Sequence, residues 1–127
     1  MLTSKPRGRQ EKALVISDYD APFPHPLRGR AGDRLSTDRS KATGIPGWIW
    51  CTAADGRSGW VPESYLRGDG ANAFLLRDYD AIELTVRTGD VLVIHAEESG
   101  FCWTENADGR HGWVPTTCLR RIAERAD

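Results

Sequence analysis

Apolar and polar positions alternate in short runs along the chain, and no stretch shows a sustained apolar period of 3.6 residues. Runs of β-branched and apolar residues predict strands over Ala13–Ser17, Ala73–Arg77 and Val91–His95. Asp55-Gly56 and Asp108-Gly109 lie between Trp-rich segments, which is typical of tight hairpins whose turns need positive φ. Several short strands with regular turns predict an all-β chain built from small barrels.

An internal repeat sets the number of barrels. Gly47–Arg67 and Gly100–Arg120 align without a gap, and twelve of the 21 aligned positions are identical. Upstream, the run Asp18-Tyr19-Asp20-Ala21 recurs as Asp78-Tyr79-Asp80-Ala81. A repeat of this kind means that one structural unit occurs twice in tandem, although a chain of 127 residues has the length of one ordinary domain.

The repeat predicts the domain boundaries. We expect a flexible basic arm over residues 1–11, a first five-stranded domain over 12–67 and a small polar linker over 68–72. A second domain with shortened loops follows over 73–121, and a tail over 122–127. A unit of this size buries only about 60% of its unfolded surface, so the two copies are expected to stabilise each other.

Charge and cysteine content narrow the functional classes. The net charge is −1, so the sequence lacks the excess of basic residues that is typical of nucleic-acid-binding proteins. No apolar run approaches the roughly 18 residues that a membrane span needs. The N-terminal residues have no apolar core or cleavage site of a signal peptide. Cys51, Cys102 and Cys118 are odd in number and fit reduced packing residues. These features predict a cytoplasmic protein that binds neither membranes nor nucleic acid.

Three motifs then point to a family. The chain has Val15-Ile16-Ser17-Asp18-Tyr19 and Leu75-Leu76-Arg77-Asp78-Tyr79, then an acidic segment that runs from Glu83 to Gly89-Asp90. It also has Gly59-Trp60-Val61-Pro62-Glu63-Ser64-Tyr65-Leu66. In this order, and twice, these motifs resemble the Src-homology-3 (SH3) family, as a tandem of bacterial-type variant SH3 repeats from Ala13 to Arg67 and from Ala73 to Arg121.

The resemblance implies five-stranded barrels whose aromatic side chains line a groove for proline-rich peptides. Such a peptide is already extended as polyproline II, so it loses little entropy on docking. Carried over by position, the first copy would supply the groove residues Tyr19, Trp48, Trp60, Pro62 and Tyr65.

The second copy would supply fewer of these residues, namely Tyr79, Phe101, Trp113 and Pro115. Ser17 and Arg77 stand where the family has its first tyrosine, and Cys118 replaces the last one.

Acidic residues that pair with a basic ligand residue are expected in the second copy, as Glu83, Glu97 and Glu98. Pro26 occupies the matching position of the first copy. The first copy therefore has the fuller aromatic set and the second has the acidic residues, so that neither copy alone is a complete peptide reader.

Catalysis is not expected, because the sequence shows no nucleophile with a base, no metal-ligand spacing and no phosphate-binding loop. His25, His95 and His111 are isolated in the sequence, and we predict no metal and no cofactor.

Pro22, Pro24 and Pro26 are expected to stiffen the first long loop into an extended path, or alternatively to serve as a ligand for a second molecule.

Two functions remain open. The first is a non-enzymatic adaptor that binds a short extended or proline-rich peptide on a protein partner, mainly through the groove of the first domain. The second is a structural or self-association module whose aromatic surfaces, including the five Trp residues, are buried between domains or subunits. The solvent exposure of Trp48 and Tyr65 distinguishes the two, and the oligomeric state is open.

Overall fold

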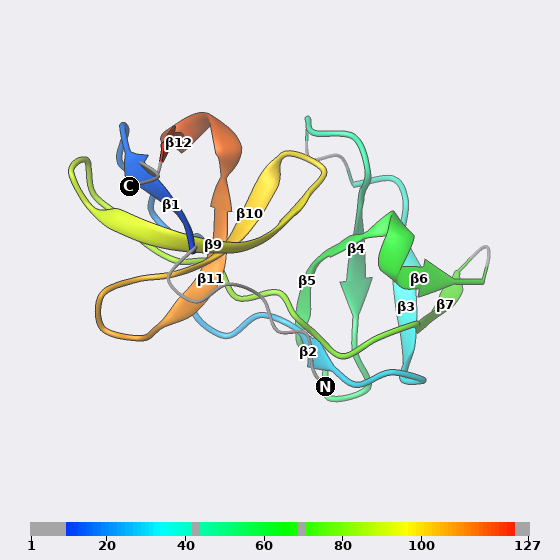
Figure 1. Ribbon diagram of the computed structural model, residues 1–127. Helices are drawn as coiled ribbons and strands as arrows, with labels where there is room; N and C mark the ends of the chain where they lie inside the picture. The colour runs from blue at the N-terminus through cyan, green and yellow to red at the C-terminus, as the bar shows by residue number, and fades with distance from the viewer. Residues whose placement is uncertain (1–9, 42–43, 69–70, 124–127) are drawn as a thin grey trace, which may run out of the picture. The chain divides into compact units, whose positions relative to one another are not determined.

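The computed structural model describes residues 10–41, 44–68 and 71–123 of the chain (Figure 1). Most of the expected N-terminal arm, linker residues 69–70 and tail residues 124–127 lie outside the described residues. The described residues form twelve β-strands and two single-turn 3-10 helices, which confirms the all-β prediction. Among them, no helix has the length and apolarity needed to cross a membrane.

The chain forms two compact units that do not coincide with the two sequence repeats. Among the described residues, unit 1 holds residues 10–20, Leu84–Glu97 and residues 101–123. Unit 2 holds Ala21–Glu83 together with Glu98–Gly100. Each unit therefore takes its opening segment from the other copy of the repeat, an arrangement that we call the strand exchange.

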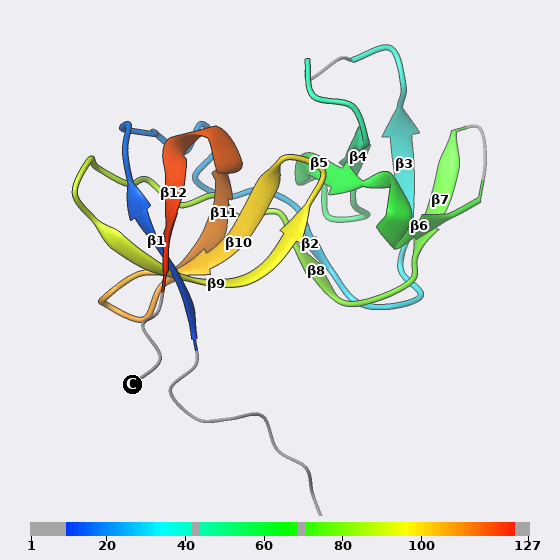
Figure 2. The ribbon, with the colours of Figure 1, turned by 45° about the horizontal axis from the view of Figure 1, so that its top comes forward.

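Unit 1 is built around a five-stranded sheet in the order β11-β10-β9-β1-β12. Its first strand, β1, comes from the first copy and lies antiparallel between β9 and β12 of the second copy (Figure 2). Ala13 faces Leu92 on one side and Arg121 on the other. The elements are β1 (Glu11–Val15), β9 (Val91–Glu98), β10 (Phe101–Glu105), β11 (His111–Pro115), a 3-10 turn (Thr116–Cys118) and β12 (Leu119–Ile122).

Unit 2 has a second five-stranded sheet, in the order β5-β4-β3-β7-β6. Here the strand from the other copy is β7, which pairs antiparallel with β3 and β6. The elements are β3 (Arg34–Asp38), β4 (Trp48–Thr52), β5 (Ser58–Pro62), a 3-10 turn (Glu63–Tyr65), β6 (Leu66–Arg67), β7 (Asn72–Leu75) and a separate pair, β2 (Arg28–Gly29) with β8 (Tyr79–Asp80).

The exchanged strands carry core residues. In unit 1, Ala13 and Val15 are fully buried, and Val15 packs in one cluster with Leu92 and Val114 of the other copy. In unit 2, Ala73 and Leu75 are buried in the same way. Because each exchanged strand fills a place in the core of its unit, the exchange is part of both hydrophobic cores.

Close approach of backbone makes one glycine necessary at the exchanged segment of unit 2. A Cβ added to Gly59, in β5, would lie 2.8 Å from the Cβ of Ala81, which belongs to the other copy. The backbone nitrogen of Ala81 donates a hydrogen bond to the carbonyl of Leu27 at 2.9 Å. Only glycine leaves room for the two copies to pack this closely.

The predicted hairpin turns are present. Gly56 and Gly109 have φ of 91° and 83°, and each accepts the left-handed conformation that the turn requires. The first two predicted strands each end two residues earlier than expected, at Val15 and Leu75. Residues of the motifs that follow, Asp18 and Asp78, instead accept hydrogen bonds from backbone N–H groups of the opposite copy.

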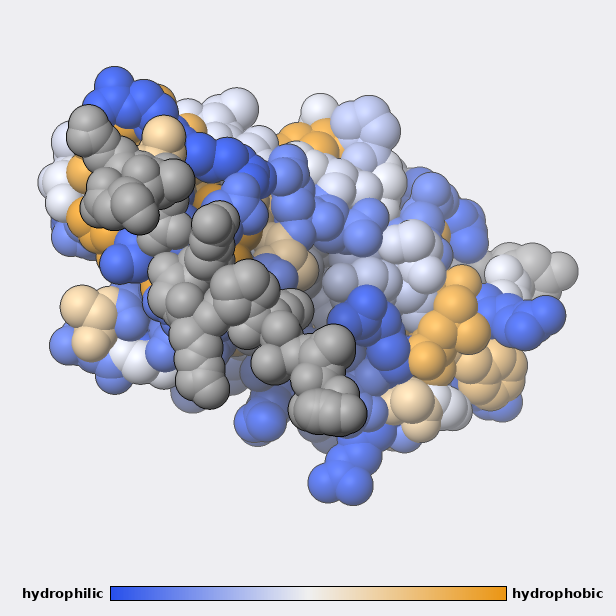
Figure 3. Space-filling view, viewed as in Figure 1, coloured by the Kyte–Doolittle hydropathy of each residue, from blue (hydrophilic) through white to orange (hydrophobic). Residues whose placement is uncertain are grey.

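Hydrophilic residues cover most of the face shown in Figure 3, and hydrophobic residues reach the surface in separate patches. The large hydrophobic side chains that are exposed belong to both units and are Ile16, Phe23, Phe74, Leu76, Val91 and Ile122. Isolated apolar side chains of this kind are normal on protein surfaces.

Candidate functional site

The candidate site of unit 2 begins with two tyrosines from different copies. Tyr65 and Tyr79 pack edge to face with ring centroids 5.5 Å apart, and Tyr79 donates a hydrogen bond from its hydroxyl to the carbonyl of Trp60 at 2.7 Å. Tyr65 is 9% exposed and Tyr79 is 6% exposed. Burial raises the pKa of both phenols, so each hydroxyl stays protonated at neutral pH.

Strand β4 presents two tryptophans on the face opposite the core. Ile49 and Cys51 are buried, whereas Trp48 and Trp50 alternate with them and are half-buried. Pro62 lies opposite Trp48 in the neighbouring strand, and Trp60 lies opposite Trp50. The alternation therefore places Trp48, Trp50 and Trp60 on one side of β4 and β5.

The indole of Trp48 already has a hydrogen-bond acceptor within unit 2. Its Nε1 donates to the backbone carbonyl of Ser99 at 2.7 Å. The side chain of Ser99 also lies close to Gly47, where an added Cβ would come within 2.6 Å of Oγ. Residues 98–100 thus partly cover Trp48.

Trp50 belongs to a second aromatic group beside the first. Its ring lies 5.0 Å from Trp60 and 5.4 Å from Phe23, centroid to centroid. The ammonium of Lys41 lies 4.1 Å above the Trp50 ring, a cation–π contact. Trp50 therefore packs among side chains on the face of β4 opposite the core.

Acidic groups of the second copy are found in the same unit as these aromatic residues. Glu83 and Glu98 both belong to unit 2, and both are half-buried. Glu83 contributes to the raised pKa of Tyr79, and Glu98 contributes to that of Tyr65, so each carboxylate acts electrostatically on the tyrosine pair. The third expected acidic residue, Glu97, is in unit 1, where it forms an ion pair with Arg121 at 2.5 Å.

The sequence profile of the variant SH3 domain matches the chain twice, over residues 12–68 and 75–122. The chain belongs to the variant SH3 domain family. SH3 domains are in general non-catalytic protein-interaction modules.

A segment of 50 residues is also similar to myosin heavy chain IB of Acanthamoeba castellanii, with 36% identity. That segment covers 37% of this chain and 4% of the myosin heavy chain, so this chain corresponds to only a small part of that protein's length.

The structure regroups the SH3 positions that the repeats suggest. Trp48, Trp60, Pro62 and Tyr65 stay together in unit 2, but Tyr19 of their own copy is in unit 1. Tyr79 of the second copy is the residue that contacts Tyr65 and Trp60. Tyr19 and Trp48 therefore belong to different units, because the segment that carries Tyr19 pairs with the second copy.

Arg77 makes a contact with Tyr65 that the sequence did not predict. It stands where the family has its first tyrosine, and its guanidinium lies 4.4 Å from the centroid of the Tyr65 ring. A cation above the ring replaces the aromatic wall that would face Tyr65 in the family. The sequence showed the substitution, but only the exchange shows which tyrosine Arg77 covers.

Unit 1 assembles the remaining SH3 positions. Tyr19 is half-buried and packs against the unit 1 core, where its backbone forms paired hydrogen bonds with Val86 at 3.0 and 2.9 Å. Trp113 is only 4% exposed. Phe101 and Pro115 face each other in β10 and β11 and are half-buried. This set lacks both the exposed tryptophan and the closing tyrosine, because Phe101 and Cys118 replace them.

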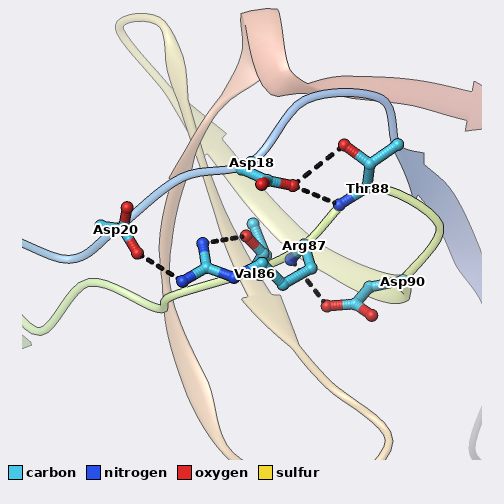
Figure 4. A network of polar contacts seen from close by, with 6 residues as sticks. All are labelled: Asp18, Asp20, Val86, Arg87, Thr88 and Asp90. Carbon is cyan, nitrogen blue, oxygen red and sulfur yellow. Dashed lines mark hydrogen bonds and ion pairs between the residues drawn. The ribbon is translucent and has the colours of Figure 1, made fainter.

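A polar network holds the exchanged segment onto unit 1 (Figure 4). Asp18 accepts hydrogen bonds from the backbone nitrogen and the hydroxyl of Thr88, at 2.8 and 3.0 Å. Asp20 pairs with the guanidinium of Arg87 at 2.7 Å. These contacts join the Asp-Tyr-Asp-Ala motif of the first copy to the Gly-Asp segment of the second.

The three cysteines are free and buried. Burial raises the pKa of Cys51 and of Cys102 to about 11, so neither thiol is appreciably ionised at neutral pH. This protonation state suits residues that pack in the core, as expected from the sequence, and does not suit nucleophiles.

Proposed function

We propose that this chain is a non-enzymatic adaptor that binds a short extended, proline-rich peptide of a protein partner through unit 2. The observation that carries the proposal is the composition of that unit. The strand exchange adds Tyr79 and Glu83 of the second copy to Trp48, Trp60, Pro62 and Tyr65 of the first. Unit 2 thereby combines aromatic residues of the first copy with an aromatic and an acidic residue of the second.

The half-buried members of this set have a physical role in contacting a peptide, whereas Pro62, Tyr65 and Tyr79 are buried and support the site. Flat aromatic faces pack against proline rings of a polyproline II segment, which is pre-organised and loses little entropy. Glu83 and Glu98 provide the negative charge that would favour a basic ligand residue near the tyrosine pair. Arg77 lies over Tyr65, so the ligand position at that ring is expected to lack a proline.

Residues 98–100, which partly cover Trp48, restrict how a ligand can bind there. A ligand carbonyl that accepts from the indole N–H has to displace the carbonyl of Ser99. Replacing one hydrogen bond with another yields little net free energy of binding, so the affinity for the peptide is expected to be modest. A dissociation constant near micromolar corresponds to about −8 kcal/mol.

We place the protein in the cytoplasm, because three buried free thiols suit a reducing compartment. No nucleic-acid or membrane partner is proposed, in keeping with the nearly neutral charge balance.

A structural or self-association role is the second candidate, and one observation favours it. Tyr65 is almost fully buried, and the indole N–H of Trp48 is already bonded within unit 2. In that case the aromatic residues serve to hold the chain's own segments together, and no peptide specificity is needed.

A single variant separates the two candidates. The untagged protein is screened against an array of proline-rich peptides, and the best peptide is measured by isothermal titration calorimetry against wild type and Trp48→Ala. We expect micromolar binding by wild type and at least about tenfold weaker binding by the variant, because a central aromatic side chain commonly dominates an interface. The thermal midpoint should change little.

The matched control is Phe101→Ala, because Phe101 occupies the position of Trp48 in the other copy and belongs to unit 1. It should leave peptide affinity within about twofold. If no peptide binds and Trp48→Ala lowers the melting temperature or changes the oligomeric state, the adaptor proposal fails and the structural role is supported.

A further inference from the structure

Three residues that could ligate a metal converge on the sheet of unit 1. His95 is in β9, Glu105 is the last residue of β10, and His111 is the first residue of β11. His95 Nε2 lies 2.9 Å from Glu105 Oε1, and His111 Nε2 lies 3.4 Å from the same oxygen. The three ligand atoms all lie within 4.8 Å of one another. The histidines are distant in sequence, so their spacing predicted no such site.

We propose that His95, Glu105 and His111 form a binding site for a zinc ion. Two imidazole nitrogens and one carboxylate oxygen are a donor set that Zn²⁺ commonly takes. Ligands that lie about 2.0–2.1 Å from a tetrahedral Zn²⁺ are roughly 3.3 Å from one another. The two distances to Glu105 bracket this value, so the site closes around an ion with small side-chain rotations.

The scaffold of the site is fixed before any ion binds. Glu105 and His111 face each other directly across β10 and β11. The turn between them is closed by Asn106, whose side-chain oxygen accepts hydrogen bonds from the backbone nitrogens of Asp108 and Arg110 at 2.9 and 3.0 Å. A site built on paired strands holds its ligands more accurately than a site on loops.

An aromatic contact orients one ligand. The ring of Trp103 stacks on His111, with centroids 6.0 Å apart and an interplanar angle of 21°. The rings of His95 and His111 are 5.5 Å apart and inclined by 30°. The Nε2 atoms of both imidazoles therefore point toward the same carboxylate oxygen of Glu105.

The protein supplies three ligands, which leaves at least one coordination position open. The side chains of His95, Glu105 and His111 are each at least one third exposed, so this position is open to water or to a side chain of a partner. Three protein ligands with an open fourth position differ from the closed sets of four that structural zinc sites use.

The test is calorimetric titration of the untagged full chain with zinc chloride, under reducing conditions, with magnesium chloride as the comparison ion. We expect one Zn²⁺ per chain and no saturable heat with Mg²⁺, which prefers oxygen ligands. His95→Ala and His111→Ala should each weaken Zn²⁺ binding at least tenfold. Both side chains are exposed on strands, so circular dichroism and melting without metal should match wild type.

The control is His25→Ala, because His25 is exposed and lies in unit 2. It should bind Zn²⁺ as wild type does. Histidine ring resonances of His95 and His111, but not of His25, should shift on titration. The proposal is overturned if wild type shows no saturable Zn²⁺ binding, or if the His95 and His111 variants bind as tightly as the His25 variant.

Discussion

At the residue scale, two aspartates of the repeated motif show how each copy is tied to the other. Asp18 of the first copy accepts a backbone hydrogen bond from Thr88 of the second, at 2.8 Å. Asp78 of the second copy accepts one from Ala31 of the first, at 2.9 Å. The sequence predicted that these motifs are equivalent, but it could not show their partners, because either copy offers an equivalent Gly-Asp segment.

The network at Asp18 predicts a pH dependence of stability. The hydrogen bonds from the backbone and side chain of Thr88 lower the pKa of Asp18 below its ordinary value of 3.8. A carboxylate with a lowered pKa in the folded state stabilises the protein above the ordinary pKa, and this contribution is lost as pH falls through the folded value. Asp18→Asn should therefore lower the melting temperature at pH 7, and its difference from wild type should shrink below about pH 4.

That difference is measured by thermal unfolding of both proteins between pH 2 and pH 7. A difference that stays constant over the whole range would mean that the ionised carboxylate of Asp18 contributes nothing.

At the element scale, the linker explains why the exchange is favoured. Only residues 68–71 separate β6 from β7, and the two strands pair as a hairpin with Leu66 opposite Leu75. Closing so short a loop costs little entropy, so the first strand of the second copy pairs at once with the last strand of the first. The corresponding place in unit 1, beside β12, is then filled by β1.

The proline-rich segment follows the first place at which the chain passes between the units. The chain passes from unit 1 to unit 2 between Asp20 and Ala21, and Pro22, Pro24 and Pro26 follow. Fixed φ angles stiffen this segment against folding back on itself. The sequence predicted the stiff path and the short linker separately. The exchange that follows from them was not predicted, because equivalent strands make nearly equivalent contacts in either arrangement.

Two matched variants test the exchange at the level of strands. Val15→Ala in β1 should destabilise unit 1 by about 1–3 kcal/mol, and Leu75→Ala in β7 should destabilise unit 2 by about 2–5 kcal/mol, because both side chains are buried. Hydrogen exchange followed by mass spectrometry locates each effect. Val15→Ala should accelerate exchange first in β9 to β12, and Leu75→Ala in β3 to β6.

The reverse pattern, with Val15→Ala loosening β3 to β6, would mean that each copy folds on its own strand.

At the scale of the whole molecule, the exchange determines which residues form the candidate site. Family membership, the all-β fold and the aromatic positions of the first copy followed from motifs, since local patterns specify them. The combination of Trp60 and Tyr65 with Tyr79 did not follow, because it depends on which copy supplies one strand. The peptide-binding proposal therefore rests on long-range pairing, which local sequence patterns do not encode.

The most direct test of the strand exchange is nuclear Overhauser spectroscopy of the 14.1 kDa chain, at a concentration where it is monomeric by light scattering. The account predicts cross-peaks between the rings of Tyr79 and Tyr65, and between the backbones of Ala13 and Arg121. Cross-peaks from Tyr19 to Tyr65, together with pairing of β1 to β6, would contradict it. Each site would then be formed by the residues of one copy alone.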